Sequence, residues 1–365
     1  MNVGIAVHRF TRAEGTGGYT VELVRRVARE ARVTLYTARV AADVPEHVEV
    51  VRVPAVMTTS YTAVLSFPPA LRAVRRRHDV FHAQGWVTGR ADVVTAHIVL
   101  AAWRRAAAAA GVRSAMGERF LGGFVEGRER RLMRRTAFVI APSRMVAADL
   151  AASYGRTERV RVVHHGFPAA AAPTDRATAR AAFGFPADRV VALFVGDLRK
   201  GLDAALAALA AVDAALLAVV SHSPVARIRE RAAAAGVGDR VIALGAQTDA
   251  GPACAAADVL LQPTIYDTFG LAIAEAMAHG LPPIVTARAG ITELIAHQRS
   301  GWIVREATPQ ALAHALRTVA GDATLRERLG RGARAVAAAR SWDDVARETL
   351  QVYREAHGSD HEGAS

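Results

Sequence analysis

Short strand-like runs alternate with helical stretches along the chain. The runs Val3–Val7, Val33–Tyr36 and Phe138–Ala141 are rich in apolar and β-branched residues, and helical stretches such as Tyr19–Glu30 and Arg144–Ser153 lie between such runs. This alternation is typical of strand–helix units whose strands form a parallel sheet. The sequence therefore predicts an α/β protein.

The alternation is interrupted once and then resumes. An Ala/Pro/Thr-rich link, Ala169–Thr178, follows Gly166-Phe167-Pro168, and the next strand-like run is Val190–Val195. A chain of 365 residues is longer than one hydrophobic core usually serves. We therefore expect two α/β domains, residues 1–168 and 169–341, with a ligand cleft between them at the carboxyl ends of the strands.

The last segment of the chain predicts one more helix. Within residues 342–357, the side chains of Val345, Leu350 and Tyr353 are spaced to share one apolar face. The polar residues 358–365 are expected to form a disordered tail.

Basic residues are concentrated in the first half of the chain. The whole sequence carries 46 Lys+Arg against 34 Asp+Glu, a net charge of +12, and residues 1–170 contain 26 Arg against 13 acids. An excess of this size attracts anionic lipid, nucleic acid or a phosphorylated substrate, although arginines on helices also form solvated faces. The densest groups are Arg72, Arg75, Arg76 and Arg77, then Arg104 and Arg105, and then Arg128, Arg130, Arg131, Arg134 and Arg135.

Several classes of protein are disfavoured by what the sequence lacks. The single cysteine, Cys254, excludes an intrachain disulfide and a cysteine-cluster metal site. Zinc-finger spacing and an RNP-type strand are missing and only 6% of residues are aromatic, so we expect no nucleic-acid partner. Without a long apolar run or a basic leader before Gly4, we expect a cytoplasmic protein.

The segment Ala257–Pro282 has the features of a phosphate-binding strand–loop–helix unit. A buried strand is expected to end at Pro263, and a helix to begin near Gly270, which allows close backbone approach. The free N–H groups of a first helical turn attract a phosphate. Asp267 and Glu275 are then spaced to accept hydroxyls at both ends of a nucleotide sugar, unless Glu275 is only an exposed helix residue.

A second loop follows the strand-like run Val190–Val195 and contains a basic pair. Arg199 and Lys200 are suited to a diphosphate, Arg as a bidentate fork and Lys as a point charge. A surface basic pair is usually only solvated. Lys200, however, is the sole lysine of the chain, which favours a specific role.

Two features of the N-terminal half are less specific. Gly17 and Gly18 follow the first strand without fitting the dinucleotide fingerprint, yet glycines at a helix start let a phosphate or sugar approach the backbone. His97 ends the strand-like run Val93–Ala96. A lone histidine is more often structural, but a position at a strand end favours the cleft.

Together these segments resemble the retaining family 4 glycosyltransferases of the GT-B fold, over nearly the whole chain and in motif order. The resemblance implies two Rossmann-like α/β domains facing a central cleft, with residues 1–168 on the acceptor side and residues 169–341 binding the nucleotide sugar. Helix 342–357 would cross back and pack on the N-terminal domain. The implied activity is hexosyl transfer from a UDP- or GDP-sugar to a hydroxyl of a cell-envelope glycan, glycolipid or metabolite, without cofactor or metal.

The resemblance also implies roles for individual residues. The family's E-x7-E signature falls on Asp267, where the first Glu is usual, and on Glu275. Glu275 would bond the ribose, Asp267 would face the donor sugar, and Arg199 with Lys200 would clamp the diphosphate. His97 is similar to the histidine near the reacting carbon. The further donor-binding positions are Gly17, Gly18, Gly196, Thr268, Phe269, Gly270 and Leu271.

Other functions remain open on the sequence. A sugar-nucleotide epimerase or a GT-B phosphorylase would use the same cleft, and incubation with donor alone or dependence on phosphate would reveal either. A non-catalytic basic protein binding anionic polymer or membrane would explain the arginines but not Glu275 and its motif. Because the chain has no D-x-D triplet, we expect Arg199, Lys200 and the helix N-terminus near Gly270 to meet the leaving-group charge. The Arg-rich half would allow peripheral contact with the inner face of the cell membrane.

Overall fold

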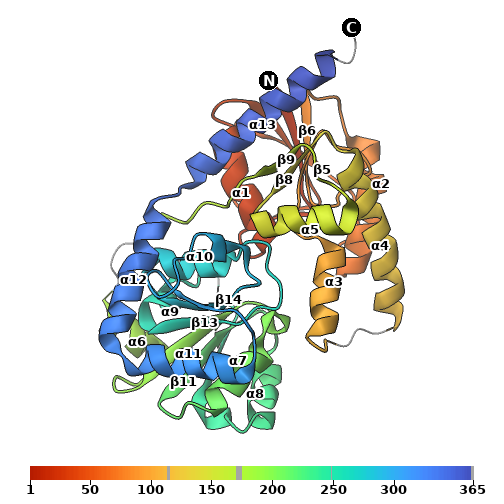
Figure 1. Ribbon diagram of the computed structural model, residues 1–365. Coiled ribbons are helices and arrows are strands. Elements are labelled where there is room, and N and C mark those ends of the chain that lie inside the picture. The colour runs from red at the N-terminus through yellow and green to blue at the C-terminus, as the bar shows by residue number, and fades with distance from the viewer. Residues whose placement is uncertain (113–115, 170–174, 248, 363–365) are drawn as a thin grey trace. The chain divides into compact units, whose positions relative to one another are not determined.

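The computed structural model describes residues 1–112, 116–169, 175–247 and 249–362, and the chain divides into two compact units. Unit 1 comprises Met1–His165 and Trp342–Ser365, and unit 2 comprises Gly166–Ser341. Each unit is built around its own sheet with helices packed against it (Figure 1). The predicted α/β class is confirmed in both.

Unit 1 contains a parallel sheet with the strand order β5-β3-β1-β6-β7-β8-β9. The order reverses at β1, because β3 pairs with one edge of β1 and β6 pairs with the other. The elements are β1 Asn2–Ala6, β2 Arg9–Phe10, α1 Gly15–Val27, β3 Arg32–Thr37, β4 Arg39–Val40, β5 Glu49–Arg52, α2 Ser60–Val74, β6 Val80–Gln84, β7 Val93–Thr95, α3 Leu100–Ala109, α4 Met116–Arg135, β8 Phe138–Ala141, α5 Arg144–Tyr154, β9 Val160–Val162 and α13 Trp342–Glu362.

The last helix, α13, belongs to unit 1 although the whole of unit 2 precedes it in the sequence. It packs against α1 and against strands β6, β7 and β8 (Figure 1). Its predicted apolar face is confirmed, since Val345, Leu350 and Tyr353 are at most 2% exposed. The helix continues to Glu362, past the expected start of the tail at residue 358, and residues 363–365 lie outside the described part of the chain.

Unit 2 contains a parallel sheet with the strand order β12-β11-β10-β13-β14-β15, which reverses at β10. Its first helix begins at Arg176, inside the expected link; residues 170–174 of that link lie outside the described residues. The elements are α6 Arg176–Phe183, β10 Val190–Val195, η1 Leu198–Lys200, α7 Leu202–Ala210, β11 Ala215–Val220, α8 Val225–Ala234, η2 Gly238–Arg240, β12 Val241–Gly245, α9 Gly251–Ala256, β13 Val259–Gln262, α10 Leu271–Ala278, β14 Pro283–Thr286, η3 Gly290–Glu293, β15 Trp302–Val304, α11 Pro309–Gly321 and α12 Ala323–Ala338.

The sheet of unit 2 is apolar on both faces. Along β10, Val191 and Leu193 enter one buried cluster, whereas Ala192 and Phe194 enter a second. Successive side chains of a strand point to opposite faces, so each cluster fills the space between the sheet and one layer of helices. This explains why the central strands appear in the sequence as unbroken apolar runs.

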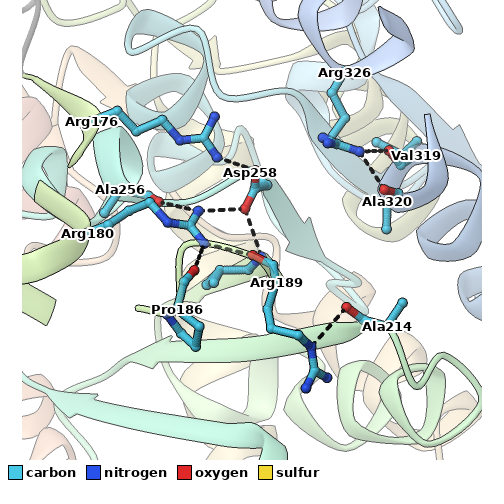
Figure 2. A network of polar contacts seen from close by, with 11 residues as sticks. Arg176, Arg180, Pro186, Arg189, Ala214, Ala256, Asp258, Val319, Ala320 and Arg326 are labelled. Atoms are coloured by element: carbon cyan, nitrogen blue, oxygen red, sulfur yellow. Dashed lines mark hydrogen bonds and ion pairs between the residues drawn. The ribbon is translucent and has the colours of Figure 1, made fainter. Parts of the chain in front are cut away.

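A buried ionic network attaches α6 to the starts of β10 and β13 (Figure 2). Asp258 accepts hydrogen bonds from Arg180 Nη1 at 2.9 Å, from Val191 N at 2.8 Å and from Arg176. Arg180 also donates to the carbonyl oxygens of Arg189 and other neighbours. Burial would raise the pKa of Asp258, but the bonds from Val191 and the two guanidinium groups outweigh it and lower the pKa. Asp258 therefore stays ionised.

Removing one member of this network should destabilise unit 2. Asp258→Asn leaves Arg180 buried without a counter-charge, and we expect a loss of about 3–5 kcal/mol in the free energy of unfolding. The matched control is Asp203→Asn, which breaks the solvent-exposed 3.0 Å pair with Arg231 and should cost about 0–1 kcal/mol. Urea unfolding followed by circular dichroism measures both. Equal midpoints for the two variants would contradict the structural role of the network.

Candidate functional site

The predicted donor residues of unit 2 lie where the strand order reverses. Lys200 follows β10 and Asp267 follows β13, and these strands are neighbours in the sheet. In open parallel sheets, ligands bind outside the carboxyl ends of the strands at such a reversal. The two segments singled out in the sequence therefore meet at one place.

Lys200 and Asp267 form an ion pair. Lys200 Nζ donates to Asp267 Oδ2 at 2.7 Å, with side-chain exposures of 42% and 13%. The Asp267 carboxylate raises the pKa of Lys200, against the opposing effect of burial. Gly196 lies beside this pair, since a Cβ atom on it would be 3.4 Å from Lys200 Cδ. The ammonium group is thus held charged and partly open to solvent.

The loop that carries Lys200 is packed closely against β13. Gly201 has φ +108, and a Cβ atom on it would lie 2.1 Å from the carbonyl oxygen of Pro263, so only glycine fits there. Arg199 points differently from Lys200: its Nε bonds Asp197 Oδ1 at 3.0 Å, and its side chain is 68% exposed. The structure therefore brings Lys200, but not Arg199, to Asp267.

The loop after β13 is fixed by backbone contacts and leads into α10. Asp267 N donates to Arg288 O at 3.0 Å, and Asp267 Oδ1 accepts from Phe269 N at 3.3 Å. Phe269 is buried with its ring edge-on to Phe167. Gly270 has φ +108 and caps α10 as predicted, followed by the half-buried Leu271. The flanking Thr268 is half-buried too.

Glu275 lies on α10 and is exposed, as the alternative interpretation of the sequence allowed. The pKa of its carboxyl is raised to about 7, because the surrounding protein limits its hydration and Asp249 adds negative charge. Burial and the negative charges of Glu275 and Asp249 raise the pKa of Cys254 on α9. Glu275 and Asp267 thus lie on the same strand–loop–helix unit, and Asp267 is the one that bonds Lys200.

Unit 1 has a hollow of about 210 Å³ at its own reversal of strand order. It is lined by residues that follow β1, β6 and β7 and by the start of α1. The lining residues are Val7, His8, Arg9, Glu14, Thr16, Gly17, Gln84, Gly85, His97 and Ile98.

The two predicted glycines of α1 have different surroundings. Gly17 lines the hollow, and a Cβ atom on it would lie 2.5 Å from Thr11 O, so it lets the helix start pack closely on the preceding loop. Gly18 would tolerate a Cβ atom, whose nearest contact is Arg12 O at 3.6 Å, and its N–H donates to Glu14 O. Only Gly17 of the pair lines the hollow.

His97 also lines the hollow. Its Nε2 is 2.8 Å from Gln84 Oε1, and its ring lies edge-on to Tyr19 with 4.8 Å between centroids. Burial lowers the pKa of His97 to about 3, so the ring is neutral at ordinary pH. Gln84 and its neighbour His82 were missed in the sequence, although the alternation of Val80–Gln84 predicts a strand that places both on one face.

Two further properties bear on the site. Within the described residues, no group of three or more His, Cys, Asp and Glu side chains is arranged to hold a metal ion. None of the described helices combines the length and apolar composition needed to cross a bilayer.

The sequence matches two families of known proteins. Residues 13–170 match the family described as Glycosyltransferase Family 4, and residues 189–322 match Glycosyl transferases group 1. The D-inositol 3-phosphate glycosyltransferase of Salinispora tropica is 32% identical over 94% of this chain and 81% of its own. The protein of the same name from a Nocardioides species is 30% identical over 76% and 68%.

Solved structures share the fold at lower identity. Sucrose-phosphate synthase from Thermosynechococcus elongatus superposes with a TM-score of 0.82 at 22% identity, over 98% of this chain and all of its own. WaaG, a glycosyltransferase of lipopolysaccharide biosynthesis, gives 0.81 at 22%, over 96% and 99%. Anabaena HepE, solved with UDP-glucose, gives 0.71 at 18%, over 97% and 99%. The chain belongs to the family 4 glycosyltransferases of the GT-B fold, which transfer a sugar from a nucleotide sugar to an acceptor.

Proposed function

We propose that this enzyme is a retaining hexosyltransferase that uses a UDP- or GDP-hexose and needs no metal ion. The observation that carries the proposal is the ion pair of Lys200 and Asp267 at the strand reversal of unit 2. An ammonium and a carboxylate side by side suit the two parts of the donor, because one attracts the diphosphate and the other accepts sugar hydroxyls. The donor class is supported by the UDP-glucose bound to Anabaena HepE, which shares the fold.

Lys200 is the main diphosphate ligand in this proposal. Its Nζ carries three N–H donors, and Asp267 uses one, so two can serve phosphate oxygens. Arg199 is exposed and can exchange its bond to Asp197 for one to a phosphate. The first turn of α10, after Gly270, adds the N–H groups of a helix N-terminus and the positive end of the helix dipole.

In the proposed reaction, configuration is retained at the anomeric carbon. The bond from this carbon to the diphosphate oxygen breaks, the acceptor oxygen bonds to the same face, and the acceptor's proton passes to the departing diphosphate. Negative charge that develops on the diphosphate is met by Lys200 and Arg199. His97 is neutral, so it supports the developing positive charge on the sugar where an imidazolium would repel it.

Removing the Lys200 charge should slow turnover far more than it weakens the fold. For Lys200→Met we expect kcat to fall by about 10²- to 10³-fold, because one charged donor to a departing oxyanion is lost. Lys200→Arg keeps the charge and should restore part of the rate. Release of UDP or GDP from the donor is the readout, with thermal unfolding as the folding control. A near-normal rate in a folded Lys200→Met protein would rule out the clamp.

Glu275 is proposed to accept hydrogen bonds from the ribose hydroxyls in its ionised form. Its pKa of about 7 lies above the ordinary value, so the carboxylate is lost as pH falls through 7. We expect the Kd for UDP-glucose, or for the GDP-sugar that binds, to rise between pH 8 and pH 6. In Glu275→Gln the Kd should be high and nearly independent of pH. Calorimetric titrations check this, and an equally steep pH dependence in the variant would assign it to another group.

Unit 1 is proposed to recognise an anionic acceptor or the anionic membrane surface that carries it. Two relatives of the whole chain are named for a phosphorylated polyol, D-inositol 3-phosphate. The last two turns of α4 carry a basic cluster that we name the α4 arginines, all exposed: Arg128, Arg130, Arg131, Arg134 and Arg135. Such a cluster adds about 1 kcal/mol of attraction per arginine near an anionic surface.

Vesicle binding tests the α4 arginines. We expect co-sedimentation with phosphatidylglycerol vesicles that weakens with salt and falls clearly in Arg131→Gln/Arg134→Gln. The matched control, Arg328→Gln/Arg331→Gln, removes two exposed arginines at the same spacing from α12 of unit 2. Equal losses in the two variants would mean that only total charge matters. Unchanged binding in both would exclude α4 as the contact surface.

A further inference from the structure

A continuous line of polar side chains joins the half-buried His97 of the unit 1 hollow to the C-terminal helix through buried residues. His97 Nε2 lies 2.8 Å from Gln84 Oε1, and Gln84 Nε2 lies 3.3 Å from each ring nitrogen of His82. His82 Nδ1 lies 2.6 Å from the hydroxyl of Tyr353 on α13. The other ring nitrogen of His82 lies 2.8 Å from Thr95 Oγ1.

These residues are placed by three different elements. His82 and Gln84 are two apart on β6, so their side chains lie on the same face of the sheet. Thr95 on β7 is the registered partner of Gln84, and α13 covers this face. His82, Thr95 and Tyr353 are 0% exposed and Gln84 is 2% exposed. Water is therefore kept from the hydrogen bonds between them.

The hydrogen-bond chain fixes which nitrogen of His97 carries the proton. An amide oxygen only accepts, so His97 Nε2 must donate to Gln84 Oε1, and the neutral ring then has its lone pair on Nδ1. The in-plane positions of both His82 nitrogens are taken by Tyr353 and Thr95, so the Gln84 amide nitrogen, 3.3 Å from each of them, lies over the His82 ring, and this contact orients the amide. Burial lowers the pKa of His82 to about 3, as it does that of His97. His82 and His97 are therefore both neutral.

The same helix supports His97 through aromatic contacts. Tyr19 of α1 is edge-on to His97 and also to Trp342, the first residue of α13, with 5.6 Å between the latter centroids. The ring of Tyr19 also contacts the ring of His165, with 4.6 Å between their centroids. The start of α13 thus supports the His97 ring by packing. Tyr353, further along the same helix, is linked to His97 through His82 and Gln84.

We propose that Tyr353, His82 and Gln84 are positioning residues through which the C-terminal helix sets the orientation and the Nε2–H tautomer of His97. The proposal rests on the role given above to His97 only where it concerns turnover. In a ring held this way, Nδ1 carries a lone pair and therefore accepts hydrogen bonds but donates none. That polarity suits a sugar hydroxyl or developing positive charge and not a phosphate.

The tautomer is measured directly by two-bond proton–nitrogen NMR of histidine-labelled protein, with His97→Gln identifying the His97 signals. We expect the Nε2–H form in the wild type, and a mixture of tautomers in Gln84→Ala and Tyr353→Phe. Tyr36→Phe is the matched control, because Tyr36 is equally buried and its hydroxyl bonds Arg76 N and His78 Nε2, neither of which belongs to the line from His97 to Tyr353. It should leave the His97 signals unchanged.

Turnover gives the second readout. In Tyr353→Phe we expect kcat to fall about tenfold while the KM for the donor and the thermal midpoint stay near those of Tyr36→Phe, since misplacement of a catalytic group affects the chemical step. His82→Gln, which can still bond both neighbours, should keep more activity than His82→Ala. A general loss of folding would instead lower the midpoint and change every His signal.

The outcomes separate this inference from the proposed function. A wild-type His97 with its proton on Nδ1, or a tautomer unaffected by Gln84→Ala and Tyr353→Phe, would overturn the positioning chain even if His97→Ala is inactive. A changed tautomer with unchanged kcat would support the chain and remove His97 from the proposed chemistry. A changed tautomer with lowered kcat would support both.

Discussion

Both candidate sites depend on the reversal of strand order in a parallel sheet. Parallel strands must be joined by crossovers, and these share one hand, so strands added to opposite edges of a central strand place their helices on opposite faces. The loops after the two central strands then diverge and leave space at their carboxyl ends. In unit 1 this happens between β1 and β6, and in unit 2 between β10 and β13. Gln84 ends β6 and Lys200 follows β10, so the strand order of each sheet places these residues at a reversal.

The pKa values of the basic side chains are shifted in opposite directions at the two sites. In unit 2, Lys200 stays charged because Asp267 compensates the loss of hydration. In unit 1, burial lowers the pKa of His97 to about 3, and burial together with the charge of Arg9 lowers the pKa of His8 to about 4. Glycosyl transfer moves negative charge onto the diphosphate and leaves positive charge on the sugar. In the proposed function, the cation Lys200 is assigned to the diphosphate and the neutral His97 to the sugar.

Sequence patterns predicted the strands and the Ala257–Pro282 segment well, because burial on both faces and helix capping are local properties. Pairing over distance could not be predicted in this way. Lys200 and Asp267 are 67 positions apart, and His82 and Tyr353 are 271 positions apart. The local sequence around one residue of such a pair therefore does not include the other residue. The basic pair of the β10 loop also looked like one unit. In the structure Arg199 is bonded to Asp197, because a side chain two residues away competes with a more distant ligand site.

The buried hydroxyl of Tyr353 also constrains the register of α13. A hydroxyl without a partner in a dry interior costs about 1–3 kcal/mol, so sliding the helix by one turn would separate Tyr353 from His82 and leave both unsatisfied. At the other end, Trp342 contacts Tyr19, which limits rotation of the helix. The contacts that fix α13 are therefore the same ones that orient His97. Docking of the last helix would therefore orient a residue of a hollow whose lining residues all lie in the first hundred positions.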